Sequence, residues 1–196
     1  RIVKPVFARF VLLRALLASL PLAAAERPGQ AAIASAHYLA TEAGHEILAQ
    51  GGNAFHAATA VSAALAVVEP TSSGMGGGAF WLLHRAEDGF QVMVDAREQA
   101  PAAAHRDMYL DAEGQVNRDL AVNGPLAGGI PGEAAGLEHL ARHYGRLPLA
   151  ASLQPAIRLA REGFPVDEKC HEMMAWRIDV IKRWQAAAAA LLADGE

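Results

Sequence analysis

Residues Glu69–Pro101 read E-P-T-S-S-G-M-G-G-G-A-F-W-L-L-H-R-A-E-D-G-F-Q-V-M-V-D-A-R-E-Q-A-P. Four of the five residues 74–78 are glycine, which costs conformational entropy unless the loop needs them. Such a loop can let two main chains approach closely, which is the interpretation we favour, or it can present N–H groups to an anion. It lacks the Gly-Lys-Ser/Thr ending of a P-loop, and it precedes a strand, whereas a dinucleotide-binding fingerprint opens a helix.

A β-hairpin is predicted directly after this loop. Phe80–His84 is nearly continuously apolar, as expected of a strand that is buried on both faces. In Phe90–Asp95 apolar and polar residues largely alternate, which is typical of a second strand. The connection ends in Asp88-Gly89, a strong turn signal, so the two strands are expected to pair.

The segments around the hairpin are predicted to be mostly helical. A small-residue strand at Ala31–Ala36 is expected to come first. The expected helices are Thr41–Gln50 with Thr41 as cap, Ala54–Glu69 with Asn53 as cap, Glu133–His143 ending at Gly145, one with Pro155 in its first turn that ends at Glu162, and most of Asp167–Leu192. The Ala54–Glu69 helix is apolar except for a stripe of His56, Thr59 and Ser62, so we expect it to be buried nearly all round.

Composition limits the classes of function. With 196 residues, 53% of them hydrophobic, the chain can bury the core of one domain. The net charge is −4 and no basic tract lies beyond the N-terminus, so no nucleic-acid partner is expected. The single cysteine, Cys170, excludes an internal disulfide and a multi-cysteine metal site.

The first 25 residues resemble an export signal. Four basic residues lie within residues 1–14, residues 11–25 are mostly apolar, and Ala23-Ala24-Ala25 offers a cleavage site before Glu26. We therefore expect a signal peptide at 1–25, a mature domain at 26–196 and a periplasmic or extracellular location. The alternatives are a frayed helix or a membrane anchor, although the apolar run is shorter than a bilayer span requires.

Other chemistry-bearing residues give weaker signals. His139 and His143 are four residues apart on one predicted helix, but no third metal ligand is indicated, and exposed helical histidines are the better interpretation. Cys170 and His171 are neighbours that point apart on a helix, which argues against a nucleophile–base pair. No metal site is predicted.

Arg97 is the candidate binding residue. It follows the second predicted strand and lies near Asp95 and Glu98. From the residues alone, two interpretations are equally good: a structural ion pair with one of these acids, or a guanidinium that binds a substrate carboxylate through two hydrogen bonds.

Taken together, these motifs resemble the start of the large subunit of gamma-glutamyltransferases, also called gamma-glutamyltranspeptidases. The matching segments are residues 36–44 (A-H-Y-L-A-T-E-A-G), 51–54 (G-G-N-A), 67–70 (V-V-E-P), 72–78 (S-S-G-M-G-G-G), 95–101 (D-A-R-E-Q-A-P), 128–132 (G-G-I-P-G) and 155–164 (P-A-I-R-L-A-R-E-G-F). Each is weak alone, but their order and spacing span most of residues 26–196.

The resemblance implies part of an α+β fold of the N-terminal-nucleophile hydrolase type, an αββα sandwich. It implies a precursor that cuts itself, after which the N-terminal Thr of the small subunit attacks a gamma-glutamyl carbonyl of glutathione or a related compound. An amino acid or water then accepts the gamma-glutamyl group, without a cofactor. Arg97 matches the family's arginine that holds the donor α-carboxylate, and no catalytic residue falls within this chain.

Three departures from the family pattern qualify this expectation. His56 stands where the family usually has Asp, Tyr38 stands where Pro usually follows the histidine, and the small subunit with its nucleophile is missing from the sequence. We therefore expect this fragment alone to be inactive and to need the small subunit of the same precursor as its partner. The alternative is a non-catalytic remnant or small-ligand-binding module of the same fold.

Overall fold

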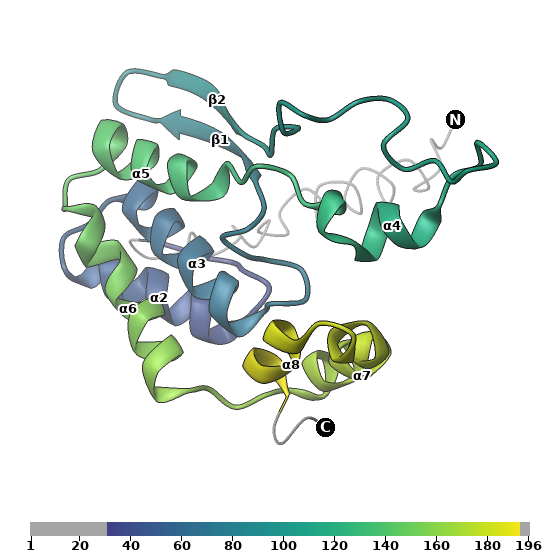
Figure 1. The fold of residues 1–196 in the computed structure, drawn as a ribbon. Coiled ribbons are helices and arrows are strands. Elements are labelled where there is room, and N and C mark those ends of the chain that lie inside the picture. The colour runs from purple at the N-terminus through teal and green to yellow at the C-terminus, as the bar shows by residue number, and fades with distance from the viewer. Residues whose placement is uncertain (1–30, 193–196) are drawn as a thin grey trace, which may run out of the picture. The chain divides into compact units, whose positions relative to one another are not determined.

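The computed structural model of the protein describes residues 31–192. The expected signal peptide at 1–25 lies outside the described residues. The elements follow in the order α2 (Tyr38–Ala49), α3 (Ala54–Val68), β1 (Ala79–Arg85), β2 (Phe90–Ala96), α4 (Arg118–Asn123), the 3-10 helix η1 (Pro125–Ala127), α5 (Glu133–Tyr144), α6 (Leu149–Glu162), α7 (Glu168–Lys182) and α8 (Gln185–Leu191) (Figure 1).

Helix α3 is the centre of the core. Helices α2, α5 and α6 all pack against it (Figure 1). Its core-facing side chains are small: Ala60, Ala63 and Ala64 have no exposed surface, which lets neighbouring helices approach closely. The buried cluster comprises Ala40, Ala43, Ala63, Ala64, Val68, Leu137 and Ala156. Only Ala54 in α3 is exposed, so the predicted burial of this helix is confirmed.

The starts of α2 and α3 are set by side-chain caps. Asn53 Oδ1 accepts from His56 N at 3.1 Å, which confirms the predicted cap of α3, and Asn53 Nδ2 donates to Tyr144 O at the end of α5 at 2.7 Å. The predicted cap at Thr41 is wrong. Helix α2 starts one turn earlier, because His37 has an extended backbone and its Nδ1 accepts from Leu39 N at 3.2 Å.

Strands β1 and β2 form the predicted antiparallel hairpin, with Ala79 opposite Ala96 and Arg85 opposite Phe90. Gly89 has a φ of 72°, which suits glycine at the end of the turn. Arg85 donates to both carboxylate oxygens of Asp88, at 2.9 and 2.6 Å. These hydrogen bonds, with a further one from Phe90 N, lower the pKa of Asp88 to about 2.

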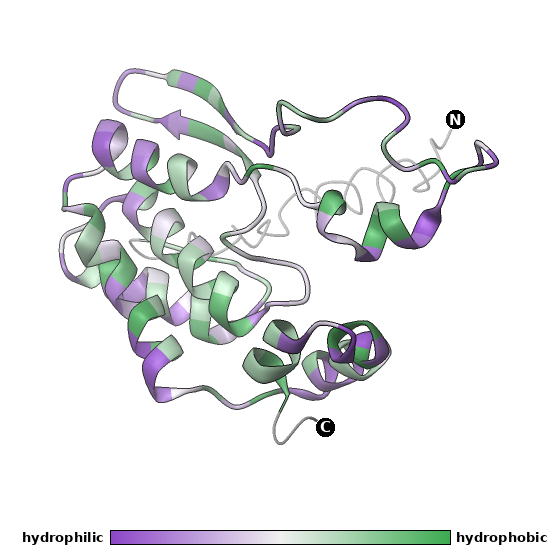
Figure 2. Ribbon diagram, in the orientation of Figure 1, coloured by the Kyte–Doolittle hydropathy of each residue, from purple (hydrophilic) through white to green (hydrophobic). Residues whose placement is uncertain are grey.

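Two strand predictions need correction. Strand β1 is not buried on both faces: Leu83 is 5% exposed, but Phe80 is 57% and Leu82 82% exposed. Much of the hairpin ribbon is green in Figure 2, which reflects its apolar residues. Residues 31–36 are not a strand, because a strand needs a ladder partner and, among residues 31–192, β1 and β2 pair only with each other.

The C-terminal helices differ in detail from the prediction. Pro155 is not in the first turn of α6 but inside it, because the helix already begins at Leu149, after Pro148. Pro155 has no backbone N–H to donate within the helix, but its ring is fully buried. The predicted helix at 167–192 is present as α7 and α8, broken at Arg183-Trp184, and neither contains a buried residue. None of the helices within residues 31–192 is both long and apolar enough for a membrane span.

Candidate functional site

The two glycine-rich passages of the sequence meet in the structure. The first joins α3 to β1 and the second leads into α5. The carbonyl of Gly77 accepts hydrogen bonds from the N–H groups of Gly132 and Glu133, both at 3.1 Å. The first loop is therefore fastened to the N-terminus of α5, although about 55 residues of sequence separate them.

Close packing of backbone explains why glycine occupies key positions in both passages. A Cβ atom on Gly78 would lie 2.6 Å from Ala96 O and 2.7 Å from Arg97 Cα. Gly132 is equally restricted, against the carbonyls of Ala96 and Arg97. Both glycine passages thus press on the end of β2 and the residues after it, which supports the close-packing interpretation. They also hold the backbone of Arg97 in place.

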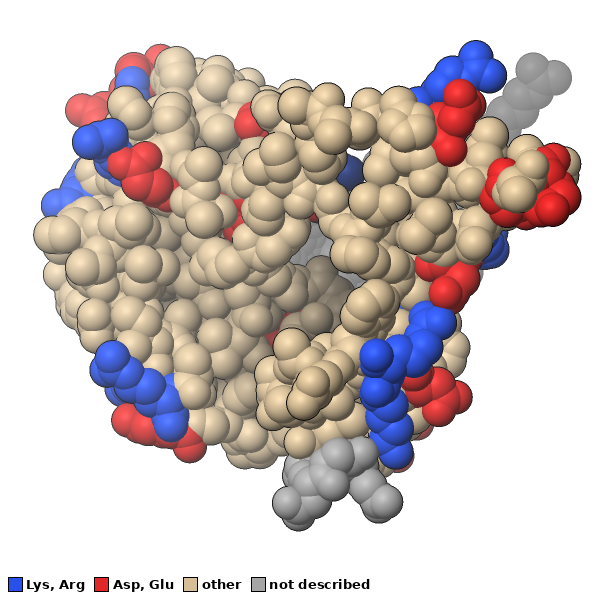
Figure 3. All heavy atoms as spheres, in the orientation of Figure 1, with Lys and Arg blue, Asp and Glu red and all other residues tan. Residues whose placement is uncertain are grey.

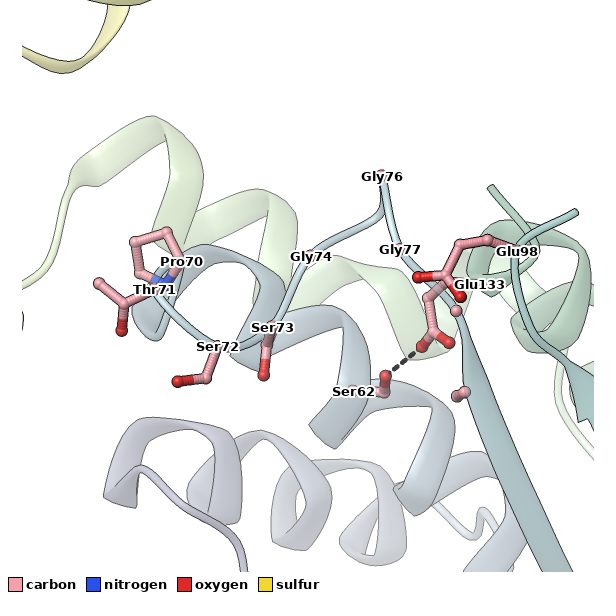
Figure 4. A pocket seen from close by; sticks show the side chains of 12 residues that line it. Ser62, Pro70, Thr71, Ser72, Ser73, Gly74, Gly76, Gly77, Glu98 and Glu133 are labelled. Carbon is pink, nitrogen blue, oxygen red and sulfur yellow. Dashed lines mark hydrogen bonds between the residues drawn. The ribbon is translucent and has the colours of Figure 1, made fainter. Parts of the chain in front are cut away.

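A cavity of about 510 Å³ lies beside the first loop, and we call it the glycine-loop cavity (Figure 4). Its lining is polar and contains two carboxylates. The lining residues are Ser62, Pro70, Thr71, Ser72, Ser73, Gly74, Gly76, Gly77, Gly78, Ala79, Glu98 and Glu133. This size falls within the range of roughly 300–1,000 Å³ that is usual for small-molecule sites.

Glu133 is the buried anion of this cavity. It is the first residue of α5 and only 5% exposed. Ser62 Oγ, on α3, donates to Glu133 Oε1 at 2.5 Å, and Figure 4 shows this bond. Glu133 Oε2 is buried and has no hydrogen-bond partner among the described residues. The positive end of the α5 dipole favours a carboxylate here, but it does not replace the missing hydrogen bond.

The structure places Arg97 directly after β2, with its side chain 60% exposed. Arg97 Nε lies 3.0 Å from Glu98 Oε2, while Asp95 Oδ1 accepts from the backbone N–H of Arg97 at 3.0 Å. The ion pair is therefore made with Glu98 and not with Asp95. The Arg97 Cζ also lies 5.8 Å from the centre of the Phe80 ring.

The two terminal nitrogens of the Arg97 guanidinium remain available for a ligand. No hydrogen bond or ion pair joins its Nη1 or Nη2 to another residue within 31–192. Arg97 lines a second cavity, of about 500 Å³, together with Asp95, Gln99 and His139 among others. A guanidinium held through Nε presents its two terminal nitrogens in the geometry that suits a carboxylate. The ion pair and a carboxylate contact are thus compatible with each other.

The other residues considered in the sequence make contacts within the fold. The His139 and His143 rings lie 4.4 Å apart between centroids, but no group of three potential metal ligands occurs in the described part of the chain. The N–H of Cys170 donates to the capping Asp167 at 2.7 Å. His56 is fully buried: its Nδ1 accepts from Arg146 N at 2.9 Å and its Nε2 lies 2.5 Å from Leu147 O.

Sequence reasoning missed the pairing of Ser62 with Glu133. The polar stripe of α3 was a usable signal, because all three of its members have partners: His56 binds the turn before α6, Thr59 Oγ1 donates to Phe55 O at 2.9 Å, and Ser62 binds Glu133. Nothing in the sequence indicates that Glu133 is buried, since acidic residues in the first turn of a helix are usually exposed.

Charged side chains of both signs occur on the surface of the protein. Around the rim of the face in Figure 3, acidic and basic side chains are interspersed.

Comparisons with known proteins identify the family. The family model for gamma-glutamyltranspeptidase matches residues 40–196. The chain is 36% identical to a glutathione hydrolase proenzyme of Escherichia coli (strain K12), over 99% of this chain and 37% of that protein. It is 38% identical to a glutathione hydrolase proenzyme of Bacillus subtilis (strain 168), over 84% of this chain and 28% of that protein. The chain thus spans less than two fifths of the length of these relatives.

Solved structures agree with this assignment. The crystal structure of Helicobacter pylori gamma-glutamyltranspeptidase superposes with a TM-score of 0.83 at 35% identity, covering 87% of this chain and 48% of that one. The predicted fold class is confirmed: the helices and the small antiparallel sheet are part of an α+β fold of the N-terminal-nucleophile hydrolase type. The chain belongs to the gamma-glutamyltranspeptidase family.

Proposed function

We propose that this chain is the first part of the large subunit of an enzyme that transfers gamma-glutamyl groups from glutathione or related donors to amino acids or water. The observation that carries the proposal is the likeness over 99% of the chain to a protein named glutathione hydrolase proenzyme. Because the chain spans 37% of that relative, the proposed nucleophile, the N-terminal Thr of a small subunit, is assigned to a part outside this sequence.

The proposed chemistry is an acyl transfer in two steps. The Thr hydroxyl attacks the gamma-carbonyl, the C–N bond of the donor breaks, and the leaving amine takes a proton. The free α-amine of the Thr can serve as the base for this step. Water or an amine then attacks the ester, the bond to the Thr oxygen breaks, and the hydroxyl regains its proton.

Arg97 is proposed to bind the donor α-carboxylate. This group is common to all gamma-glutamyl donors, whereas the leaving group varies. The geometry that supports the role is the ion pair between Arg97 Nε and Glu98, which leaves the two terminal nitrogens for a substrate carboxylate. The ring of Phe80, 5.8 Å from Cζ, further restricts the guanidinium.

Export is proposed from the sequence of residues 1–25. N-terminal sequencing of the protein recovered from the source cell should start near Glu26, in a periplasmic or extracellular fraction. An intact leader on cytoplasmic protein would remove this part of the proposal.

The whole proposal is tested by expressing the complete gene and measuring glutathione hydrolysis. Self-cleavage into two subunits and release of glutamate are expected, while residues 1–196 expressed alone should show neither. Full-length protein that folds but neither cleaves itself nor hydrolyses gamma-glutamyl compounds would favour a non-catalytic ligand-binding module instead.

A further inference from the structure

Two carboxylates meet at one wall of the glycine-loop cavity. Glu133 comes from the start of α5 and Glu98 from the segment after β2, and Figure 4 shows their side chains next to each other. The Oε2 atoms of both are buried, and neither has a hydrogen-bond partner in the part of the chain that the structure describes. Glu98 Oε2 at least has the charge of Arg97 at 3.0 Å.

Glu133 lacks such a counter-charge within the described residues. No ion pair of Glu133 occurs among residues 31–192. A carboxylate that is 95% buried with one oxygen unpaired is unfavourable in the empty cavity, because the lost hydration is not replaced. A ligand that donates hydrogen bonds and carries positive charge would remove this deficit.

The lining defines the class of ligand. The cavity contains no Lys, Arg or His, and its polar side chains are the hydroxyls of Ser62, Thr71, Ser72 and Ser73 and the two carboxylates. This set attracts a cation. A metal ion is disfavoured, because no group of three His, Cys, Asp or Glu residues is found within 31–192. A primary ammonium group fits better, since its three N–H donors match a carboxylate and nearby hydroxyl or carbonyl oxygens.

We propose that the glycine-loop cavity binds the ammonium group of the acceptor amino compound, with Glu133 Oε2 as its principal contact. This inference rests on the proposed transfer function. Glu98 separates the two binding positions: on one side it pairs with Arg97, which is assigned to the donor carboxylate, and on the other it faces Glu133. Before the amine attacks the acyl-enzyme, the ammonium loses one proton, and the Glu133 carboxylate takes it to become a carboxylic acid.

The kinetic test compares Glu133→Gln with Glu138→Gln in the full-length, self-cleaved enzyme. Glu138 is the matched control, because it lies on the same helix but is exposed and paired with Arg142 at 3.1 Å. With glycine as acceptor, the ratio of transfer to hydrolysis should fall about 10- to 100-fold in Glu133→Gln, the loss expected for one hydrogen bond to a charged group. The ratio should stay unchanged in Glu138→Gln. An unchanged ratio in Glu133→Gln would overturn the proposal.

A binding test separates this inference from the proposed function. Calorimetry of the wild-type protein should detect glycine but not N-acetylglycine, which keeps the carboxylate and lacks the ammonium. Glu133→Gln should weaken glycine binding by the same factor as the kinetic ratio. Binding of both compounds, of neither, or of Ca²⁺ in preference to glycine would overturn the proposal. If the wild-type protein hydrolyses no gamma-glutamyl donor, the proposed function fails, while this binding result still decides the ammonium site.

Discussion

His56 connects the centre of the core to the turn between α5 and α6. The ring, fully buried on α3, accepts from Arg146 N at Nδ1 (2.9 Å), and its Nε2 lies 2.5 Å from Leu147 O. The Leu147 N–H also donates to Nε2, at 2.8 Å, so the ring contacts backbone groups of both residues 146 and 147. Gly145 is packed against the same ring, where a Cβ atom would collide with it. Replacing His56 therefore tests how the site-bearing helix α5 is anchored at its C-terminal end.

The expected cost of His56→Ala follows from two contributions. Truncating a large, fully buried ring leaves a cavity, which costs about 3–5 kcal/mol for aromatic residues. Leaving the backbone groups of residues 146 and 147 without partners costs about 1–3 kcal/mol each when they are buried. Arg146 is exposed, so water replaces part of the second contribution. We expect a total destabilisation of about 4–8 kcal/mol, of which about 1–3 kcal/mol comes from the unpaired backbone groups.

Two further variants separate the cost of the cavity from the cost of the unpaired backbone groups. His56→Phe fills the volume but leaves the backbone groups unpaired, so it should cost about 1–3 kcal/mol. His45→Ala, an exposed histidine on α2, is the matched control and should change stability by less than about 0.5 kcal/mol. The assay is denaturant unfolding of the full-length protein, combined with hydrogen exchange at the amides of residues 146 and 147. The reasoning is refuted if His56→Ala is no more destabilising than His45→Ala, or if His56→Phe is as stable as the wild type.

Two smaller predictions concern the loop and the hairpin. Gly78→Ala should destabilise the protein by about 1–3 kcal/mol and impair donor binding, because its Cβ would meet the backbone of residues 96–98. Gly76 has open space around it, so Gly76→Ala should be neutral in the same unfolding and kinetic assays. Equal effects of the two substitutions would contradict the close-packing account. The pKa of Asp88, about 2 in the folded protein, should rise towards its ordinary 3.8 in Arg85→Gln, as followed by NMR titration. The pKa of Asp88 is lower in the folded than in the unfolded protein, so its contribution to stability is present above about pH 4 and lost as the pH falls towards 2. A stability difference between the wild type and Arg85→Gln that grows in acid would therefore contradict this prediction.

Local signals in the sequence were sufficient for much of the fold. Asn53 marks the start of α3 because its side chain caps a helix without help from distant residues. The Asp88-Gly89 turn specifies the hairpin in the same way. Arg97 was also placed correctly just after β2, since its position depends only on where that strand ends.

Contacts that the local sequence pattern does not show account for the rest. Ser62 and Glu133 are 71 residues apart and meet only because α5 packs on α3. The cap of α2 was assigned to Thr41, but Thr41 Oγ1 instead lies 2.8 Å from Ser35 Oγ, and His37 takes over the cap. The apolar run of β1 suggested burial on both faces, yet burial depends on what covers each face, and the strand sequence does not contain that information.

The role of Arg97 is the central claim about the site, and donor kinetics of Arg97→Ala test it most directly. The surface pair with Glu98 is worth only about 0–1 kcal/mol, so the variant should fold and cleave itself normally. Loss of the donor carboxylate contact should cost about 2–5 kcal/mol, roughly 30-fold to several thousand-fold in kcat/KM, mainly through KM. Arg97→Lys should also impair the donor, because it keeps the charge but loses the two-bond geometry.

The control for this measurement is Arg158→Ala, which also removes an exposed arginine from an ion pair, in this case with Glu46 on α2. Its donor kcat/KM should equal that of the wild type. The account predicts normal self-cleavage of Arg97→Ala together with a large rise in donor KM. Normal self-cleavage with a wild-type donor kcat/KM would contradict it, and the ion pair with Glu98 would then be the whole role of Arg97.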